Sequence, residues 1–328
     1  MEYRNLGKEQ IKVSSLGLGC YSIGTWLDKR AAQNLIDSAI DLGINFFDTA
    51  DAYGGGKSEE ILGESLGNRR PQVIIATKFG RRIKGEFNIP EQYGDYCASS
   101  QYIIKAVDNS LSRLRTDYID LYQLHHPDPF TPIEETLTTL YGLIQAGKVR
   151  YIGCSNFNTS QLVEAMETGR KTGLISFSTT QELYNLIDRE IEKELLLSYD
   201  NYGLGLIPFR PLRNGFLAGV YKRGQGIPEG TRYAVKPELL INDMSNTMRE
   251  SFFSDRNFDI LERLQDFAEN RLHTVAELSI AWLLSRPVVC SVIAGAENKA
   301  QLMMNIKGSD WKLSAEELNE VNLLIGNY

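Results

Sequence analysis

The feature of this sequence that most constrains its fold is a repeated alternation of short apolar runs with amphipathic helical segments. Several runs, such as Val73-Ile74-Ile75-Ala76, are apolar at consecutive positions, which is typical of strands covered on both faces. The alternation predicts a parallel sheet whose strands are joined by crossover helices. The expected strands lie at residues 16–20, 45–50, 73–79, 120–125, 151–155, 178–181, 205–209 and 288–294.

Eight such units in a chain of 328 residues predict an α/β fold of the (β/α)8 TIM-barrel type. Residues 3–13 precede the first expected strand, and we predict that they form a short N-terminal β-hairpin. No Pro/Ser-rich linker or change of composition divides the chain. Residues 1–328 are therefore expected to form a single barrel domain.

Composition argues against several classes of protein. Hydrophobic residues make up 42% of the chain, which is enough for a large core and unlike a disordered protein. Lys and Arg total 35 against 42 Asp and Glu, and the net charge of −7 argues against a nucleic-acid partner. The four cysteines form no C-x-x-C pattern, and no run of eighteen apolar residues occurs. The sequence thus predicts a cytoplasmic protein with no membrane partner.

Two long stretches, residues 80–99 and 221–255, depart from the alternation of strands and helices, because they have no sustained hydrophobic period. Each follows a predicted strand, and loops that follow strands lie at the C-terminal face of a barrel, where active sites are found. Long irregular loops in compact domains are usually functional. We predict that the stretch 221–255, which carries five basic residues, is a mobile cover over that face.

The ends of three successive predicted strands carry residues suited to proton transfer: Asp48, Lys78 and His125. Tyr53 lies five residues past Asp48, just before three consecutive glycines at 54–56. Each residue alone is more typical of a solvated barrel rim. Together they form a proton-transfer unit, because a phenol with a pKa of about 10 needs a nearby cation to exchange a proton near neutral pH. Lys78 can supply that cation, Asp48 can hold the lysine, and His125 can orient a carbonyl oxygen.

Two other motifs point to different chemistry and carry less weight. His125 and His126 are adjacent, as in some metal sites, but neighbours on a strand point to opposite faces, so only one is expected to enter the barrel. No carboxylate cluster of a metal-dependent hydrolase is evident, and no metal is expected. In the string GLGCYS, Ser22 stands where a G-x-G-x-x-G motif needs its third glycine, which argues against a Rossmann domain.

Five strings, in this order and spacing, resemble the aldo-keto reductase superfamily from residue 3 to about residue 305. They are NFFDTADAY at 45–53, ATK at 76–78, DLYQLH at 120–125, GCSNF at 153–157 and VIAGAENK at 292–299. The resemblance implies a (β/α)8 barrel without a Rossmann motif. It also implies a catalytic tetrad of Asp, Tyr, Lys and His, which falls on Asp48, Tyr53, Lys78 and His125.

The resemblance further implies contacts to a nicotinamide dinucleotide. Ser155, Asn156 and Gln181 fall where the family hydrogen-bonds the nicotinamide carboxamide. Phe209 falls where an aromatic ring stacks on the nicotinamide, and the guanidinium of Arg210 can reach the pyrophosphate. The other positions that match the family's cofactor site are Gly19, Cys20, Tyr21, Asp48, Leu212, Asn214, Gly295, Glu297, Lys299, Gln301 and Asn305.

One turn departs from the family pattern. The family often reads Gly-Ala-Arg there, with the Arg meeting the 2′-phosphate of NADP, whereas this chain has Gly295-Ala296-Glu297. A carboxylate repels a phosphate and can bind a ribose 2′-hydroxyl, so NADH stays open as the cofactor. Lys299, at the start of the next predicted helix, can offset the repulsion. The expected cofactor is NADPH.

The function implied by the resemblance is that of an NAD(P)H-dependent oxidoreductase with Tyr53 as general acid and base. It would transfer a hydride between the nicotinamide and an aldehyde or ketone, or the corresponding alcohol. The alternative is an NADP(H)-binding sensor or regulatory subunit with little turnover, as in the potassium-channel β subunits that share this fold. The expected partner is a small-molecule carbonyl or alcohol, and a homo-oligomer stays open. The substrate pocket is expected to be lined by Tyr21, Trp26, Tyr53, Phe79, His125 and His126.

Overall fold

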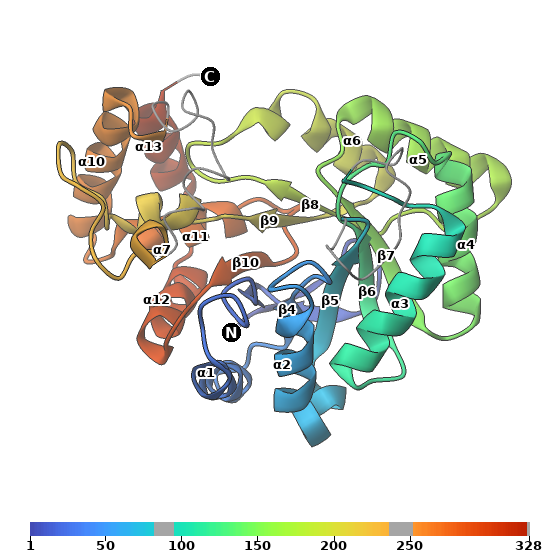
Figure 1. The fold of residues 1–328 in the computed structure, drawn as a ribbon. Helices are drawn as coiled ribbons and strands as arrows, with labels where there is room; N and C mark the ends of the chain where they lie inside the picture. The colour runs from blue at the N-terminus through green and yellow to red at the C-terminus, as the bar shows by residue number, and fades with distance from the viewer. Residues whose placement is uncertain (82–94, 236–251, 327–328) are drawn as a thin grey trace.

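Figure 1 shows the computed structural model, which describes residues 1–81, 95–235 and 252–326. Eight parallel strands form one sheet in the order β10-β3-β4-β5-β6-β7-β8-β9. The first seven lie within two residues of their predicted bounds. The strands are β3 Leu16–Gly19, β4 Phe46–Asp48, β5 Ile74–Phe79, β6 Ile119–Leu124, β7 Val149–Ser155, β8 Thr179–Leu183, β9 Gly205–Phe209 and β10 Val292–Gly295.

The sheet closes into a barrel through a short pairing just before β10. Leu206 of β9 donates its N–H to the Val288 carbonyl over 2.8 Å and accepts from the Cys290 N–H over 2.9 Å. Strand β10 then pairs with β3, so every strand of the sheet has two neighbours. The predicted (β/α)8 barrel is confirmed. The eighth expected strand, residues 288–294, is divided between this bridge and β10.

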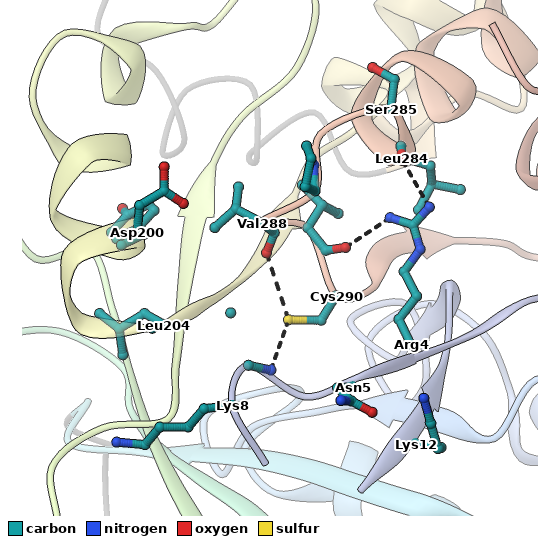
Figure 2. Close-up of a pocket in the computed structure, with 16 residues that line it drawn as sticks. Arg4, Asn5, Lys8, Lys12, Asp200, Leu204, Leu284, Ser285, Val288 and Cys290 are labelled. Atoms are coloured by element: carbon teal, nitrogen blue, oxygen red, sulfur yellow. Dashed lines mark hydrogen bonds between the residues drawn. The ribbon is translucent and has the colours of Figure 1, made fainter. Parts of the chain in front are cut away.

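The predicted N-terminal hairpin is present as β1 Tyr3–Asn5 and β2 Lys12–Ser14. It lies across the start of the barrel strands, where Leu6 and Val13 pack against inward side chains such as Phe46 and Ile293. Arg4 donates to the Leu284 carbonyl over 2.8 Å and to the Val289 carbonyl over 3.0 Å, as Figure 2 shows. The pocket drawn there has a volume of about 730 Å³. It lies at the opposite end of the barrel from the predicted active site.

Helices cover the outside of the barrel (Figure 1). Helix α11 is buried at all ten of its positions, because it packs against both α10 and α12. None of the described helices has both the length and the apolar character needed to span a membrane. The helices are α1 Lys29–Asp41, α2 Lys57–Leu66, α3 Ser100–Leu114, α4 Ile133–Gln145, α5 Thr159–Thr172, α6 Leu195–Tyr202, α7 Arg232–Val235, α10 Asp255–Glu269, α11 Val275–Leu284, α12 Lys299–Asp310 and α13 Ala315–Ile325, with short 3-10 segments η1 Gly67–Gln72, η3 Glu190–Glu192 and η4 Arg213–Ala218.

Much of the two predicted functional loops lies outside the described residues. Residues 82–94 of the first loop and 236–251 of the second are not described, so the predicted mobile cover over 221–255 is described only at its two ends. Within the first of these ends the chain forms the short helix α7.

Candidate active site

The residues predicted to transfer protons lie together at the carboxyl ends of neighbouring strands. Asp48 is the last residue of β4, Lys78 is the second-last residue of β5, and His125 directly follows β6. Main-chain hydrogen bonds join these ends, since the His125 N–H donates to the Phe79 carbonyl over 2.8 Å. The pairing of the strands therefore places three functional side chains at one mouth of the barrel.

Lys78 is the centre of this group. Its side chain is fully buried, and its Nζ lies 2.6 Å from Asp48 Oδ1, 2.9 Å from the Thr49 carbonyl oxygen and 3.3 Å from the Tyr53 hydroxyl. Burial lowers the pKa of the ammonium, but the Asp48 carboxylate and Tyr53 raise it, and the net shift is upward. Lys78 is therefore a permanent cation beside the phenol.

The Asp48 carboxylate is held by more than the lysine. Its Oδ2 accepts from Gln181 Nε2 over 2.7 Å and from Gln123 Nε2 over 3.4 Å. Sequence reasoning assigned Gln181 to the cofactor and did not identify Gln123. A signal was available in the sequence, because Gln123 lies within the expected strand 120–125, and in the structure it is paired with Lys78 of β5. Both amides help to fix the carboxylate that holds Lys78.

Tyr53 reaches Lys78 from a turn that requires glycine. Gly54, Gly55 and Gly56 have positive φ angles of 60°, 63° and 89°. A Cβ atom at Gly54 would lie 2.7 Å from the carbonyl oxygen of Gly24. This turn directs the Tyr53 side chain back over the mouth of the barrel.

The half-buried Tyr53 ring lies between two other rings at the mouth. Its centroid is 5.0 Å from that of Tyr21 and 6.0 Å from that of His125, both in edge-to-face geometry. Burial raises the pKa of the Tyr53 phenol, while the Lys78 ammonium opposes that rise. The phenol is protonated at neutral pH and is poised to donate a proton.

The two adjacent histidines lie on the same side of the structure, contrary to prediction. Their rings stack with centroids 5.0 Å apart and an interplanar angle of 17°, and Tyr96 packs against His126 at 4.5 Å. Strand β6 ends at Leu124, so the alternation of side chains along a strand does not apply to them. Burial and the charge of Lys78 hold the pKa of His125 well below its usual range, and burial lowers the pKa of His126 to about 4. Both imidazoles are neutral at pH 7.

The expected substrate-pocket residues separate into two groups. Tyr21 and Trp26 are half-buried, and the centroids of their rings are 5.7 Å apart. The Tyr21 ring also packs against Tyr53. Phe79 differs from the expectation, because it is fully buried and stacks on Tyr122 with ring centroids 4.5 Å apart. Its neighbour Lys78 points into the barrel, so Phe79 points outward, toward the helices.

The expected carboxamide-binding residues lie at the ends of β7 and β8. Ser155 is the last residue of β7 and donates its hydroxyl to the Gln181 carbonyl over 2.7 Å. Asn156 follows in a left-handed conformation with a φ of 62°, and its Nδ2 donates to the His125 carbonyl and to Ser155 Oγ, each over 3.0 Å. These hydrogen bonds join the ends of three successive strands.

The residues expected around the nicotinamide and pyrophosphate form a compact turn after β9. Phe209 ends the strand and is half-buried, as is Leu212. Arg210 and Asn214 both have a φ of 53°, and the Asn185 side chain donates to the Arg210 carbonyl over 3.2 Å. This left-handed geometry turns the chain sharply at the barrel mouth.

Helix α7 connects that turn to the aromatic side of the mouth. Arg232 donates to Asn214 Oδ1 over 3.2 Å, and its guanidinium lies 4.7 Å from the Tyr21 ring centroid. Asn214 also donates to the Tyr233 hydroxyl over 2.7 Å. The described beginning of the predicted cover thus contacts both the expected cofactor turn and the expected substrate pocket.

The turn between β10 and α12 contains a contact that the sequence did not predict. Trp26 Nε1 donates to Glu297 Oε1 over 2.8 Å, although 271 positions separate the two residues. The Glu297 N–H donates to Gln301 Oε1 over 2.9 Å. Lys299, the first residue of α12, is exposed. The Glu297 carboxylate is therefore tied to the loop after β3.

Asn305 and Gly295 complete this end of the expected cofactor site. Asn305 is buried and its Nδ2 donates to the carbonyl of the exposed Gly295 over 3.2 Å. Its Oδ1 is also buried and has no hydrogen-bond partner among the described residues. A buried acceptor without a donor is costly, which suits a ligand that carries an amino group.

The first expected cofactor residues, at the end of β3, are largely engaged within the protein. Gly19 is half-buried and pairs with Gly295 and with Asp48 in the sheet. The Cys20 side chain is fully buried, and its N–H donates to the Asp48 carbonyl over 2.8 Å. The thiol of Cys20 faces the interior, so it packs in the core.

Comparison with known proteins gives matches along nearly the whole chain. The model described as Aldo/keto reductase family matches residues 15–325. A probable voltage-gated potassium channel subunit beta of Oryza sativa subsp. japonica is 35% identical over 315 residues, which cover 94% of this chain and 92% of that protein. Aldo-keto reductase YhdN of Bacillus subtilis (strain 168) is 33% identical over 334 residues, or 100% of this chain and 94% of that protein. The uncharacterized oxidoreductase YrpG of the same bacterium is 34% identical over 98% of this chain and 95% of that protein.

Proposed function

The chain belongs to the aldo/keto reductase family, and from this premise we propose that it uses NADPH to reduce a small aldehyde or ketone, with the alcohol oxidised in reverse. One observation carries the proposal. The buried Lys78 ammonium lies 2.6 Å from the Asp48 carboxylate and 3.3 Å from the Tyr53 phenol. This arrangement suits a general acid that must donate a proton and then bear a negative charge.

Each residue has a distinct part in this chemistry. Tyr53 donates its phenolic proton to the carbonyl oxygen of the substrate, and Lys78 stabilises the resulting phenolate. Asp48 keeps Lys78 charged and in place. Neutral His125 donates an N–H to the same carbonyl oxygen, which orients the substrate before proton transfer. In alcohol oxidation, the Tyr53 phenolate accepts the proton.

The donor set around the mouth fits a nicotinamide dinucleotide. The buried Oδ1 of Asn305, which has no hydrogen-bond partner in the described part of the chain, suits the amino group of an adenine. The Ser155 hydroxyl and Asn156 amide suit a carboxamide, and the Phe209 ring suits stacking against a nicotinamide. When bound, the reduced nicotinamide supplies the hydride that the carbonyl carbon receives. We assign the adenosine end to the turn before α12 and the nicotinamide end to the strand ends beside Asp48.

Preference for NADPH over NADH is the finer part of the proposal. The Glu297 carboxylate accepts from the Trp26 indole, which directs one of its oxygens toward the loop after β3. Exposed Lys299 begins α12, where a cation and free N–H groups favour a phosphate. Both observations support a 2′-phosphate despite the carboxylate. We also place the protein in the cytoplasm, since all four cysteines are free and buried.

The test is turnover of a nitrobenzaldehyde or a simple diketone with NADPH and with NADH. We expect NADPH oxidation that depends on the carbonyl compound and is lost in Tyr53→Phe. A second candidate function is favoured by the relatives named as potassium channel β subunits. A sensor or regulatory subunit would bind NADPH tightly and show no such turnover, which would overturn the proposed reaction.

A further inference from the structure

Glu182 is a buried carboxyl group that the proposed chemistry does not use. It follows Gln181 in β8, and because Gln181 points into the barrel toward Asp48, Glu182 points to the outer side of the strand. Only 6% of its surface is exposed. Within residues 1–81, 95–235 and 252–326, no Lys, Arg or His forms an ion pair with it. A buried carboxyl without a cation needs another reason to be there.

The Glu182 carboxyl accepts one hydrogen bond from the turn after β7 and one from its own strand β8. Its Oε1 accepts from the Phe157 N–H over 3.3 Å and from the Thr180 hydroxyl over 2.9 Å. Phe157 is itself buried and packs against Phe177 with ring centroids 5.8 Å apart. Both of these donors reach the same oxygen of the carboxyl group.

The surroundings of Glu182 favour its neutral form. Burial raises the pKa of Glu182 to about 8, although the hydrogen bonds from Thr180 and from the Asn156 and Phe157 N–H groups oppose the rise. The titratable groups that interact with it are the Cys154 thiol of β7 and the Tyr199 phenol of α6. Burial raises the pKa of both, so both are neutral. Among the residues that the structure describes, no nearby group compensates a carboxylate charge at this position.

The turn held by Glu182 carries a residue that reaches the proposed active site. Asn156 donates to the main-chain carbonyl of His125 over 3.0 Å, and Ser155 donates to the Gln181 carbonyl over 2.7 Å. Glu182 is thus linked to the end of β6 by its hydrogen bond to Phe157, by the main chain between Phe157 and Asn156, and by the hydrogen bond from Asn156 to His125. Displacement of the turn would shift both the Asn156 amide and the His125 imidazole.

We infer that Glu182 is the positioning residue of this turn. By accepting from the turn main chain it holds Asn156 in its left-handed conformation, and through Asn156 it sets the place of His125 and of the amide proposed to bind the nicotinamide carboxamide. The part that concerns the carboxamide rests on the proposed function. The part that concerns Asn156 and His125 does not.

This role makes the turn sensitive to pH in a defined direction. Ionisation of Glu182 would place an uncompensated charge in a buried site, and the turn must open to hydrate it. Affinity for the nicotinamide end of the cofactor is then expected to fall as the pH rises above about 8. Glu182→Gln keeps a carbonyl oxygen that can accept the same hydrogen bonds and cannot ionise, so it should remove this pH dependence.

The experiment measures the Kd of NADPH by protein fluorescence between about pH 6.5 and about pH 9.5. We expect the Kd of the wild type to rise about tenfold between about pH 8 and about pH 9.5, because an unsatisfied buried group is costly. The Kd of Glu182→Gln should stay within about twofold over the same range. Glu182→Leu removes the acceptor and should weaken NADPH at every pH. Adenosine 2′,5′-bisphosphate has no nicotinamide and should bind all three proteins equally. Glu277→Gln is the matched control, because Glu277 is equally buried at 6% exposure and lies in α11.

Equal pH dependence in the wild type and in Glu182→Gln would overturn the inference, as would an equal effect on adenosine 2′,5′-bisphosphate. A wild type that binds no NADPH at all would instead overturn the proposed function. The inference is then decided by hydrogen exchange at the Asn156 and Phe157 amides, corrected for the intrinsic rate. Faster opening above about pH 8 in the wild type supports it, and unchanged opening refutes it.

Discussion

The ammonium group of Lys78 is fully buried, and burial alone would lower its pKa. Asp48 at 2.6 Å outweighs that effect, so the lysine remains charged where no water can screen it. A fixed positive charge in a site of low dielectric acts strongly on the neighbouring phenol. The reactivity expected of Tyr53 therefore originates in the ion pair behind it.

The first prediction concerns the proton donor. Tyr53→Phe removes the hydroxyl and leaves the ring, so kcat for carbonyl reduction should fall by about 10² to 10⁴. The Kd for NADPH should change little, because Tyr53 is not among the proposed cofactor contacts. Steady-state kinetics and fluorescence titration of the same preparation test both statements. A kcat like that of the wild type would assign the proton to another group.

The second prediction concerns the cation. Lys78→Met removes the charge that lowers the Tyr53 pKa, so the alkaline loss of reductase activity, which occurs as the phenol ionises, should move to higher pH. The rate should also fall, because a phenol with a higher pKa is a weaker acid. The variant leaves the Asp48 carboxylate buried and unpaired, which should cost about 3 to 5 kcal/mol in the free energy of unfolding.

The double variant Lys78→Met with Asp48→Asn is the control for this prediction. It removes the uncompensated charge, so urea denaturation should show that part of the stability has returned. Its activity should remain low, because the cation is still absent. If the double variant regained the wild-type rate, Lys78 would have no part in proton transfer.

Much of the proposed site could be identified from the sequence, but the residues that support it could not. The sequence was enough to identify Asp48, Lys78 and His125, because strand ends converge in any barrel. Gln123 could also be found, because alternation along the expected strand 120–125 places it on an inward face. The Trp26–Glu297 hydrogen bond depends on how two loops fold across 271 positions, and no local pattern encodes that. The stacking of His125 on His126 likewise depends on where β6 ends.

At the scale of elements, the strands were easier to predict than the connections. Apolar runs set the strand positions, because a strand covered on both faces must be apolar throughout. The expected strand 288–294 included the segment that bridges to Leu206, but its separation from β10 was not predictable from the run of apolar residues. The turn after β9 was equally obscure, since Arg210 and Asn214 adopt left-handed conformations that glycine usually takes.

The third prediction concerns the turn before α12. Replacement of a carboxylate by a cation near the proposed 2′ position should strengthen NADPH binding relative to NADH in Glu297→Arg. Lys299→Ala should shift the ratio of the two Kd values the other way. At surface-like dielectric each change is expected to be about 1 kcal/mol, or about fivefold. Titration of each variant with both dinucleotides gives the ratio.

Trp26→Phe is the control for Glu297→Arg, which removes both the carboxylate charge and the hydrogen bond from Trp26. It removes the indole N–H that Glu297 accepts and leaves the carboxylate, so the ratio should not move toward NADPH as it does in Glu297→Arg. If neither Glu297→Arg nor Lys299→Ala alters the ratio, the 2′ position is recognised elsewhere.

At the scale of the whole molecule, the two ends of the barrel have separate tasks. The carboxyl ends of the strands hold the proposed chemistry, and the opposite end is covered by the hairpin of β1 and β2. Arg4 binds that hairpin to the Leu284 and Val289 carbonyls, next to the closing bridge (Figure 2). Substitutions at the hairpin end should therefore change stability without changing activity.

The fourth prediction follows from that separation. Arg4→Met keeps the aliphatic stem but removes the donors to two part-buried carbonyls, and should lower the free energy of unfolding by about 1 to 3 kcal/mol. The kcat and the Kd for NADPH should stay unchanged. Chemical denaturation and steady-state kinetics test the two statements. A loss of activity at temperatures where the variant is folded would contradict the separation of the two ends.

The position of β10 also has a consequence for synthesis of the protein. The strand that closes the barrel between β3 and β9 is the last of the sheet to be translated. A nascent chain that stops before Val288 therefore carries two open sheet edges, one at β3 and one at β9, and open edges invite pairing with other chains. Ribosomes that stall late on this message are therefore expected to release an aggregation-prone product, because both edges stay open until the final strand has emerged.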